Sequence, residues 1–430
     1  MTGPPGLPSL RVSASWVVPI EGQPIPDGAV LVGQNGRILA VGSDSEVPSP
    51  PATHTERFPD ATLLPGLVNA HTHLELTGLE NPGDPADFSG WIRRIRQLKQ
   101  ARSPEEYRQA AREGLAQCWR AGVTTIADTG DSGSVIEVLA EMGGRGVAYQ
   151  EVFGPHPDQT ASSLAQLERA LERLGRFTSD RVRLGVSPHA PYTVSGPLYR
   201  AVAELADRDD LPIAVHLAES RAESELIASG TGPFAEAWRG RGIPLPSDVR
   251  HLDRPFPVRT PVRWLHEHGV LGPATLCIHV VQADPADIAV LAGTDSAVAH
   301  CPLSNAAHRH GEAPLREFLA AGIRVGVGTD SSASIGRLDL MAEARVAQAL
   351  GGLEAAAALR LITLEAALAI GLTDVGLIAP GAWGDLTVIR LSARPPGSAL
   401  TPGTVAEAVL ASGPGDVLET WIAGREVFRT

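Results

Sequence analysis

The stretch Ala61-Thr-Leu-Leu-Pro-Gly-Leu-Val-Asn-Ala-His-Thr-His73 decides the fold prediction. Its apolar run, residues 63–70, is typical of a buried strand, and the run is followed at once by two histidines. Because alternate residues of a strand share a face, the side chains of His71 and His73 should converge where the strand ends. Neutral imidazole is a common ligand of divalent transition metals, so the pair is a candidate metal site, with two surface histidines as the alternative.

Seven further apolar runs follow the first one, and each precedes a stretch with helical periodicity. They lie at 123–127, 146–153, 182–186, 212–215, 276–278, 297–299 and 323–327. Alternating strands and helices indicate βα units and a parallel sheet. Eight such units over roughly 300 residues fit a (β/α)8 TIM-type barrel of the α/β class, and a doubly wound open sheet is the competing architecture.

The two ends of the chain have a different pattern from the middle. Short apolar runs separated by Gly, Pro, Asp and Asn occur at 12–16, 28–33, 37–42, 385–389, 406–410 and 417–422. This punctuation is typical of strands and turns. We therefore expect residues 1–60 and 375–430 to form a small β-sandwich domain together, beside a metal-dependent barrel that spans 61–374.

Composition narrows the class of protein. The 430 residues are 43% hydrophobic and 20% charged, as in globular proteins, and the formal net charge of −13 argues against nucleic acid or membrane as a partner. The three cysteines are widely spaced, and neither a secretory signal nor an apolar stretch of roughly 18 residues is evident. We expect a soluble cytoplasmic protein, and a homodimer is compatible with the sequence.

Nearly every expected barrel strand ends in a polar residue that can take part in chemistry. These residues are His71, His73, Asp128, Glu151, His189, His216, His279, His300 and Asp330. In a barrel all these strand ends meet on one face, which favours the barrel over the open sheet. Three histidines and an aspartate would form a suitable N3O ligand set for one divalent ion with a position left for water. Zinc is the first expectation, and iron and manganese suit the same ligands.

Several motifs together resemble those of the amidohydrolase superfamily, and in particular its cyclic-amidine deaminase and chlorohydrolase branch. They are PGLVNAHTH at 65–73, VHLAE at 215–219, His279, HCPLSN at 300–305 and GTDSS at 328–332. The resemblance spans most of the chain. It implies that Glu219 is the proton shuttle and that His279 hydrogen-bonds the attacking water or the reacting atom. It also implies that one metal is bound by His71, His73, His216 and Asp330.

The only lysine bears on the number of metals. Superfamily members with two metals generally bridge them with a carboxylated lysine from strand four, whereas Lys99 lies in the expected helix 91–101. We therefore expect a mononuclear site, unless a carboxylate such as Glu151 takes the bridging role. The absence of a suitably placed lysine also argues against Schiff-base chemistry and pyridoxal phosphate.

The motifs predict a hydrolytic deamination. A metal-activated hydroxide would attack an sp² carbon that bears an amino group, after Asp330 takes a proton from the water. Glu219 would protonate the neighbouring ring nitrogen, and His279 would stabilise the developing amino alcohol. Asp330 would then deliver the second proton to the departing ammonia.

The loop after the first strand suggests a substrate. The sequence His-Thr-His-Leu-Glu75, followed by Phe88-Ser-Gly-Trp91, is similar to that of aminodeoxyfutalosine deaminases, which implies an adenine nucleoside that carries a benzoate. We expect Glu75 to bind a ribose hydroxyl or a substrate amine, and Phe88 and Trp91 to stack on a ring. His189 is similar to the strand-four histidine of nucleoside deaminases, which implies that it contacts substrate. The alternatives are a solvated loop carboxylate and aromatic packing on helices.

An arginine should meet the benzoate of such a substrate. The candidates are Arg145, Arg221, Arg254, Arg309 and Arg337. The segment 240–261, rich in Pro and Arg, would be an inserted loop over the mouth of the barrel or a subunit contact. Two other functions stay open: an amidase-type hydrolase of a cyclic amide or peptide, similar to imidazolonepropionases or dipeptidases, and a non-catalytic scaffold. Because every expected ligand position is filled, the sequence disfavours the scaffold.

Overall fold

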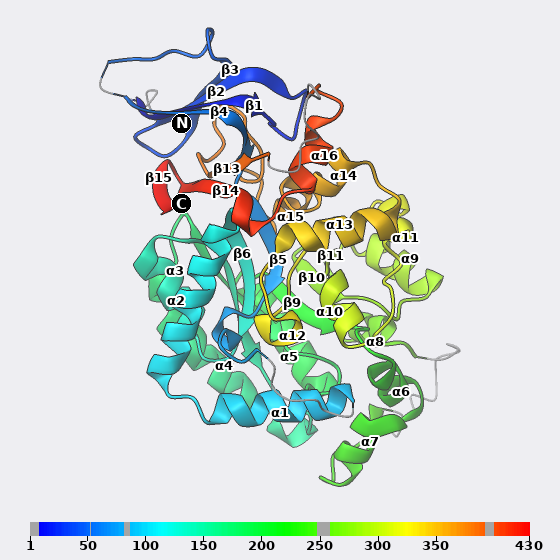
Figure 1. The fold of residues 1–430 in the computed structure, drawn as a ribbon. Helices are drawn as coiled ribbons and strands as arrows, with labels where there is room; N and C mark the ends of the chain where they lie inside the picture. The colour runs from blue at the N-terminus through cyan, green and yellow to red at the C-terminus, as the bar shows by residue number, and fades with distance from the viewer. Residues whose placement is uncertain (1–7, 52, 81–86, 247–258, 392–399) are drawn as a thin grey trace.

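The computed structural model describes residues 8–51, 53–80, 87–246, 259–391 and 400–430. Its central element is an eight-stranded parallel sheet whose strands follow one another in chain order (Figure 1). The strands are β5 (Leu67–Thr72), β6 (Val123–Gly130), β7 (Arg145–Val152), β8 (Val182–Pro188), β9 (Ile213–Leu217), β10 (Thr275–His279), β11 (Ala297–His300) and β12 (Val325–Val327). The expected barrel strands are therefore present in the expected order.

The sheet closes nearly completely between its last and first strands. Thr72 and Asp330 form a parallel bridge, and the backbone N–H of Asp330 donates to the carbonyl of His71 at 3.1 Å. Only glycine allows this approach at position 328, since a Cβ there would lie 2.6 Å from the backbone nitrogen of His71. Closure brings His71 and Asp330 together, which are 259 positions apart in the chain. It confirms the predicted barrel.

Helices surround the barrel strands and cover one end of the barrel (Figure 1). They are α1 (Phe88–Gln100), α2 (Pro104–Arg120), α3 (Ser134–Met142), α4 (Thr160–Leu174), α5 (Gly196–Arg208), α6 (Arg221–Ser229), α7 (Gly232–Arg239), α8 (Pro261–Glu267), α9 (Pro285–Gly293), α10 (Pro302–Ala307), α11 (Leu315–Ala320), α12 (Ser332–Ile335), α13 (Leu340–Gly351), α14 (Ala355–Arg360), α15 (Leu364–Ala369) and α16 (Val405–Leu410). Short 3-10 turns occur at Leu74–Leu76, Pro157–Gln159, Gly175–Phe177 and Pro414–Asp416. No described helix is long and apolar enough to cross a membrane.

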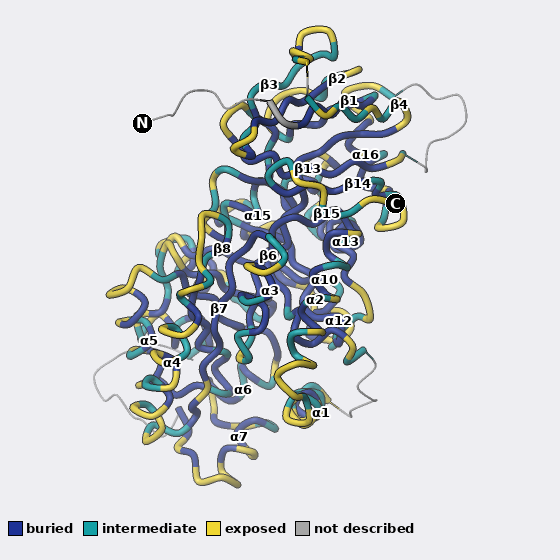
Figure 2. Tube along the Cα trace, turned by 90° about the vertical axis from the view of Figure 1, so that its left-hand side faces the viewer, coloured by how far each residue is buried: buried dark blue, intermediate teal, exposed yellow. Residues whose placement is uncertain are grey.

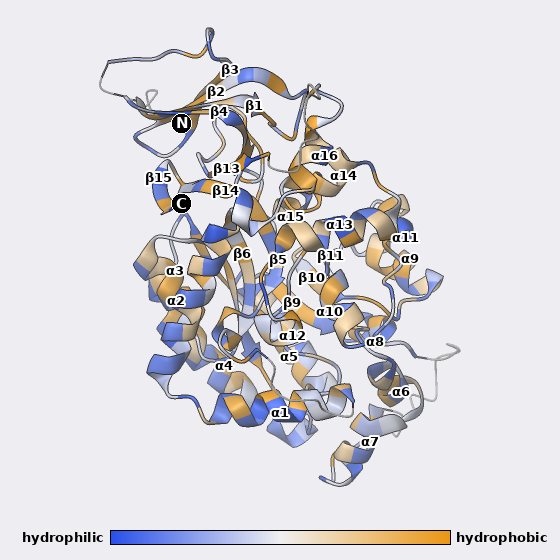
Figure 3. Ribbon diagram, in the orientation of Figure 1, coloured by the Kyte–Doolittle hydropathy of each residue, from blue (hydrophilic) through white to orange (hydrophobic). Residues whose placement is uncertain are grey.

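Each barrel strand sends alternate side chains to opposite faces. In β9, Ile213, Val215 and Leu217 belong to the large apolar cluster shared with the helices, whereas Ala214 belongs to a separate inner cluster. His216 is in phase with Ala214 and therefore points into the barrel. Figure 2 shows the barrel strands as the most buried part of the trace, and Figure 3 shows the helices as mixed in hydropathy.

The chain ends form a second, seven-stranded mixed sheet in the order β15-β14-β13-β4-β1-β2-β3. Its strands are β1 (Pro8–Val17), β2 (Ile25–Gly33), β3 (Ile38–Ser43), β4 (His54–Pro65), β13 (Leu386–Arg390), β14 (Val417–Ile422) and β15 (Arg425–Arg429). β1 and β4 are parallel, and the other neighbours are antiparallel. The sheet lies where the barrel strands begin, whereas α1 and α7 lie at the opposite end (Figure 1). The expected β-rich unit built from both termini is thus confirmed.

Two local predictions were wrong. The run 63–70 is not one strand, because β4 ends at Pro65 and β5 begins at Leu67. Gly66 between them packs on Thr124, where a Cβ would lie 2.1 Å from Oγ1. The run 406–410 is helical, in α16, since its buried residues Val405, Ala406, Val409 and Leu410 repeat after four positions. Short apolar runs do not distinguish strand from helix by themselves.

Candidate metal centre

The structure gathers the four predicted metal ligands at the carboxyl ends of the barrel strands. Asp330 Oδ1 lies 3.7 Å from His71 Nε2 and 3.6 Å from His73 Nε2. The Nε2 atoms of His73 and His216 are 3.2 Å apart. A tetrahedral zinc site with bonds of about 2.0–2.1 Å would separate its donors by roughly 3.3–3.4 Å, so these spacings are close to those of an ion-binding set.

Backbone carbonyls fix the orientation of two of these imidazoles. His73 Nδ1 lies 2.7 Å from the carbonyl oxygen of Thr129, and His216 Nδ1 lies 3.1 Å from that of His189. A carbonyl can only accept, so each Nδ1 carries the proton and each Nε2 presents a lone pair to the pocket. A hydrogen bond of this kind is the usual support for a histidine that binds a metal.

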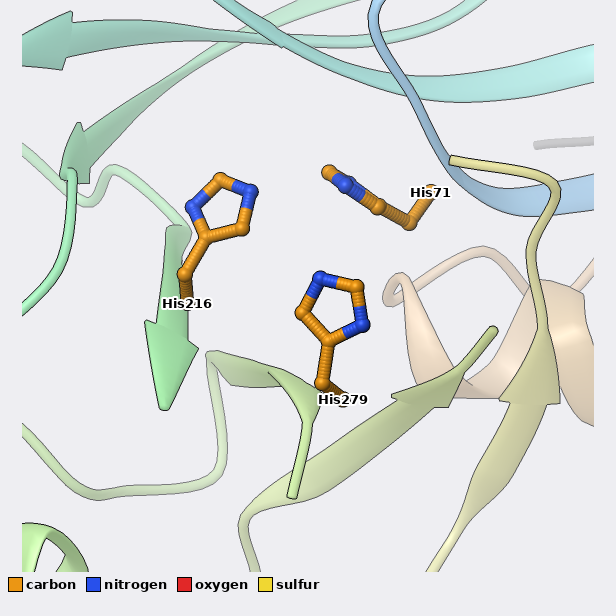
Figure 4. Close-up of side chains that lie close together, drawn as sticks. All are labelled: His71, His216 and His279. Carbon is orange, nitrogen blue, oxygen red and sulfur yellow. The ribbon is translucent and has the colours of Figure 1, made fainter. Parts of the chain in front are cut away.

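His71 shows most directly that a cation fits here. Its ring is 1% exposed, and neither ring nitrogen has a hydrogen-bond partner among the described residues. Burial and the neighbouring imidazoles hold the pKa of His71 well below its usual value, so the ring is neutral. Figure 4 shows His71, His216 and His279 converging from three strands. The residues present therefore fit a divalent metal ion.

Glu219 and His279 lie beside the four donors. Glu219 Oε1 is 3.5 Å from His279 Nε2, and His279 Nδ1 is 2.9 Å from Asn305 Oδ1. The backbone N–H of Glu219 donates to the Glu223 carboxylate at 2.9 Å, which fixes the turn after β9. Burial opposes ionisation of Glu219, but His279 and His310 outweigh it and lower its pKa to about 2. Glu219 is therefore ionised at neutral pH.

Strained backbone accompanies this geometry. His279 has φ 72° and Asp330 has φ 55°, both in the left-handed region that residues with a Cβ rarely occupy. Such strain persists where surrounding contacts impose it, and it clusters at functional sites. Ser304 Oγ donates to Asp330 Oδ2 at 2.5 Å, and the backbone N–H of Ser331 donates to Oδ1 at 2.7 Å. Asp330 is thereby aimed at the histidines.

The metal-type donors form the floor of a pocket of about 470 Å³. His73, His216 and Asp330 line its base, and Phe88 and Trp91 of α1 line one side. The two aromatic rings are stacked, with centroids 5.9 Å apart. The predicted positions of Trp91 and His189 at the pocket are thus observed, whereas their contact with substrate stays a prediction.

Comparison with protein-family models decides the family. Residues 62–427 match the model described as the Amidohydrolase family. This chain belongs to the amidohydrolase family. The predicted enzyme class, a metal-dependent amidohydrolase acting on carbon–nitrogen bonds, is confirmed with it.

Three relatives of this amidohydrolase show the range of similarity. The aminodeoxyfutalosine deaminase of Deinococcus radiodurans is 33% identical over 336 residues, 76% of each chain. The 5-methylthioadenosine/S-adenosylhomocysteine deaminase of Pelotomaculum thermopropionicum is 30% identical over 439 residues, which cover 98% of this chain and 94% of that one. The structure of an adenosine deaminase from Xanthomonas campestris with bound zinc aligns with a TM-score of 0.81 and 28% identity, over 98% of this chain and 93% of that one.

In this amidohydrolase, Glu75 and Lys99 form an ion pair with each other that the sequence did not predict. Glu75 is 1% exposed and lies beneath the pocket lining, where its Oε1 is 2.7 Å from Lys99 Nζ and its Oε2 accepts from Ser132 Oγ at 2.5 Å. Lys99 lies in a helix, α1, as expected, but α1 crosses the mouth of the barrel, so that Lys99 lines the pocket. Burial opposes the charge on Lys99, but Glu75 and Asp131 hold its pKa well above the usual value. The amine is thus a poor nucleophile, which preserves the argument against Schiff-base chemistry.

The four predicted arginines that the structure describes do not line the pocket. Arg145 is buried at the other end of the barrel against Asp385, Arg221 is exposed on α6, and Arg254 lies outside the described residues. Arg309 and Arg337 are exposed and do not line the pocket. Two other arginines line it instead, Arg96 of α1 and Arg241, which belongs to the predicted insertion 240–261. Most of that insertion, 247–258, is likewise not described.

Sequence reasoning also missed two groups that contact Glu219. His310 Nε2 lies 3.3 Å from Glu219 Oε1, and the hydroxyl of Tyr192 donates to Oε2 at 3.3 Å. A signal for His310 was present, because His308 and His310 repeat the two-residue spacing of the first histidine pair. Of the other strand-end residues, Asp128 accepts from the backbone of Leu74 at 2.7 Å. His300 is buried, belongs to none of the ligand clusters among the described residues, and has no hydrogen-bond partner there for either ring nitrogen.

Proposed function

We propose that this amidohydrolase is a metal-dependent deaminase that hydrolyses the N6-amino group of an adenine nucleoside and releases ammonia. The observation that carries the proposal is the cluster of four metal-type donors beside the Glu219–His279 pair, with three of them, His73, His216 and Asp330, lining one pocket. The names of the relatives, an aminodeoxyfutalosine deaminase and a 5-methylthioadenosine/S-adenosylhomocysteine deaminase, support the substrate class. Zinc is the proposed metal, and iron and manganese suit the same donors.

The ligands in this proposal are His71, His73, His216 and Asp330. A divalent ion held there would supply Lewis-acid activation, lowering the pKa of water toward neutrality. Glu219 is ionised, so it accepts the first proton of the attacking water and delivers it to the ring nitrogen beside the attacked carbon. Asp330 then takes up the second proton, from the hydroxyl group of the tetrahedral adduct.

The remaining steps also fall to residues of this chain. His279 Nε2, 3.5 Å from Glu219 Oε1, hydrogen-bonds the developing alcohol. Asp330 returns its proton to the leaving nitrogen, so that ammonia departs and the ring keeps oxygen in place of the amino group. Water is limited at this point by the aromatic side of the pocket, Phe88 and Trp91.

The rim of the pocket favours a substrate with an anionic group on its 5′ substituent. Arg96 and Arg241 are exposed, line the pocket, and have no carboxylate partner among the described residues. Arginine binds carboxylates in a bidentate manner, which suits a benzoate. We therefore propose aminodeoxyfutalosine as the first substrate to test and S-adenosylhomocysteine as the second.

A substrate screen of the zinc-loaded protein tests the proposal. Ammonia release is followed with aminodeoxyfutalosine, S-adenosylhomocysteine, 5′-methylthioadenosine, adenosine, guanine and cytosine. We expect release from adenine nucleosides, fastest from those with an anionic 5′ substituent. Ring opening of a cyclic amide, with no ammonia from any aminated heterocycle, would instead establish the amidase-type alternative.

A further inference from the structure

The pocket wall holds a buried carboxyl group that the proposed reaction does not use. Glu151 lies near the end of β7, its side chain is 3% exposed, and it lines the pocket. Its Oε1 has no hydrogen-bond partner among the residues that the structure describes. A buried polar atom without a partner is unfavourable, so this oxygen is a candidate to bind a polar group of a ligand.

Two gaps of equal width flank this carboxyl group. Lys99 Nζ lies 4.0 Å from Glu151 Oε2, and His189 Nε2 lies 4.0 Å from Glu151 Oε1. Both distances exceed the roughly 2.7–3.2 Å of a direct hydrogen bond. One oxygen atom can hydrogen-bond to both sides of each gap at normal distances. The wall can therefore accept two hydroxyl groups side by side, one at each carboxyl oxygen.

On the lysine side, a donor is free to point into the gap. The Lys99 ammonium has three N–H donors, of which one is directed at Glu75 Oε1, 2.7 Å away, and one at Asp131 Oδ1, 2.6 Å away. The third can serve a hydroxyl oxygen that lies between Lys99 and Glu151. Glu75 and Asp131 are thus positioning residues for Lys99.

On the histidine side, the gap is bounded by an acceptor. His189 Nδ1 lies 2.8 Å from Thr193 Oγ1, and the Thr193 hydroxyl donates its own proton to the carbonyl of Ala190 at 3.1 Å. Nδ1 therefore carries the proton, and Nε2 accepts. A hydroxyl in this gap donates to His189 and accepts from Glu151, which requires a protonated carboxyl group. Burial raises the pKa of Glu151 to about 8, consistent with this requirement at neutral pH.

The position of Glu151 indicates which part of a substrate it meets. Its carboxylate oxygen and nitrogens of His189 and His216 all lie within 4.8 Å of one another, so the carboxyl group is next to the metal centre. Arg96 and Arg241, in contrast, are exposed at the rim. In a nucleoside whose amino group lies at the metal centre, the purine ring comes next, then the sugar, and the 5′ substituent is outermost.

We propose that Glu151, Lys99 and His189 bind the two neighbouring hydroxyls of the ribose, with Glu151 as the residue that selects a cis-diol. The inference rests on the proposed function, because it takes the substrate to be a nucleoside. It transfers the sugar contact that the sequence suggested for Glu75, in the turn Leu74–Leu76, to Glu151 of β7. Glu75 acts through Lys99 instead.

The test compares three nucleosides that differ by one hydroxyl each. For zinc-loaded wild-type protein, kcat/KM is measured with adenosine, 2′-deoxyadenosine and 3′-deoxyadenosine. We expect each deoxynucleoside to be at least about tenfold poorer, because a missing hydroxyl leaves the pocket's polar groups unpaired. Glu151→Met should lower kcat/KM about 100-fold for adenosine and far less for the deoxynucleosides. Glu151→Gln, which keeps a donor and an acceptor, should retain the preference, and Glu141→Met on the outer surface is the matched control.

The outcomes separate this inference from the proposed function. Equal kcat/KM values for the three nucleosides with wild-type protein would overturn the inference and leave the deaminase intact. An equal loss on all three substrates in Glu151→Met would also overturn it, because a merely structural role predicts that pattern. If that variant does not fold, the wild-type ratios decide. No ammonia from any of the three would count against the proposed function itself.

Discussion

The two ends of the barrel both bury charged groups but treat them differently. At the end next to the mixed sheet, the side chains of Arg145 and Asp385 are 3% and 1% exposed and form an ion pair. The backbone N–H of Ala423 also donates to Asp385 Oδ1 at 2.7 Å. The ring of Trp383 covers the guanidinium at 4.3 Å. At the mouth, the nitrogens of His71 and an oxygen of Glu151 are left without partners among the described residues. The end next to the mixed sheet pairs its buried charges with each other, which stabilises the fold. The mouth leaves donors and acceptors available to a ligand.

The largest effect is expected from a mouth residue. Glu219→Gln removes the proton carrier but preserves the size of the side chain, so kcat should fall by about 10²–10⁴. Metal content, measured by atomic absorption, and the thermal unfolding temperature should change little. A variant with near-normal turnover would show that Glu219 is not the shuttle.

At the opposite end, a substitution should affect stability rather than chemistry. Arg145→Met leaves the buried Asp385 carboxylate without its cation, and breaking such a pair costs about 3–5 kcal/mol. Denaturant unfolding should show this loss, while the folded fraction keeps its kcat. Arg37→Met is the matched control, because Arg37 stacks on the other face of Trp383 but is 31% exposed, so its loss should be below about 1 kcal/mol. Equal losses for the two variants would contradict the contrast between buried and exposed pairs.

Glu151 should lower the free energy of unfolding as the pH rises. Its folded pKa of about 8 exceeds the value of 4.5 for a free carboxyl group, so the folded state binds more protons between these pH values. Its contribution is fully favourable below about pH 4.5 and is lost as the pH rises through about 8. Relative to Glu151→Gln, wild-type protein should therefore lose on the order of a few kcal/mol over this window. Parallel pH–stability curves for the two proteins would exclude the raised pKa.

The smallest effects are expected at the exposed rim. Arg96→Met and Arg241→Met should each lower kcat/KM a few-fold for aminodeoxyfutalosine or S-adenosylhomocysteine, because exposed charge pairs contribute about 0.2–1 kcal/mol. Activity on 5′-methylthioadenosine, which lacks the carboxylate, should stay unchanged. The difference should shrink as salt rises. Equal losses of kcat/KM on all three substrates would show that Arg96 and Arg241 do not bind the carboxylate of the substrate.

Much of the site could be predicted from the residues at the carboxyl ends of the expected strands. His71, His216 and Asp330 each follow an apolar run, and the carboxyl ends of parallel strands share one face of a barrel, so their convergence could be predicted from spacing and topology. The barrel itself followed from eight alternating units. Its junction at Gly66 did not, since an apolar run continues through the point where the chain passes from one sheet to the other.

Residues on helices and loops could not be placed in this way. Lys99 reaches the pocket because α1 crosses the mouth, and Arg96 comes with it on the same helix. Arg145 is on a strand, at the beginning of β7, and therefore lies beside the mixed sheet; its partner Asp385 comes from the far end of the chain and could not be placed in this way. The hydrophobic periodicity of a sequence does not show how a helix packs over a barrel, because this packing depends on contacts with several distant segments.

The sequence by itself determined the barrel, the β-rich unit formed by both termini, and the histidines and aspartate brought together by the strand ends, because strand periodicity and parallel topology are local or repeated properties. The tertiary structure alone decided which charges are neutralised. It paired Lys99 with Glu75, turned Arg145 away from the pocket, and left Glu151 open beside His189. The physical reason is that burial and pairing depend on neighbours far apart in the chain, and these set the charge state and free hydrogen-bonding capacity of each group.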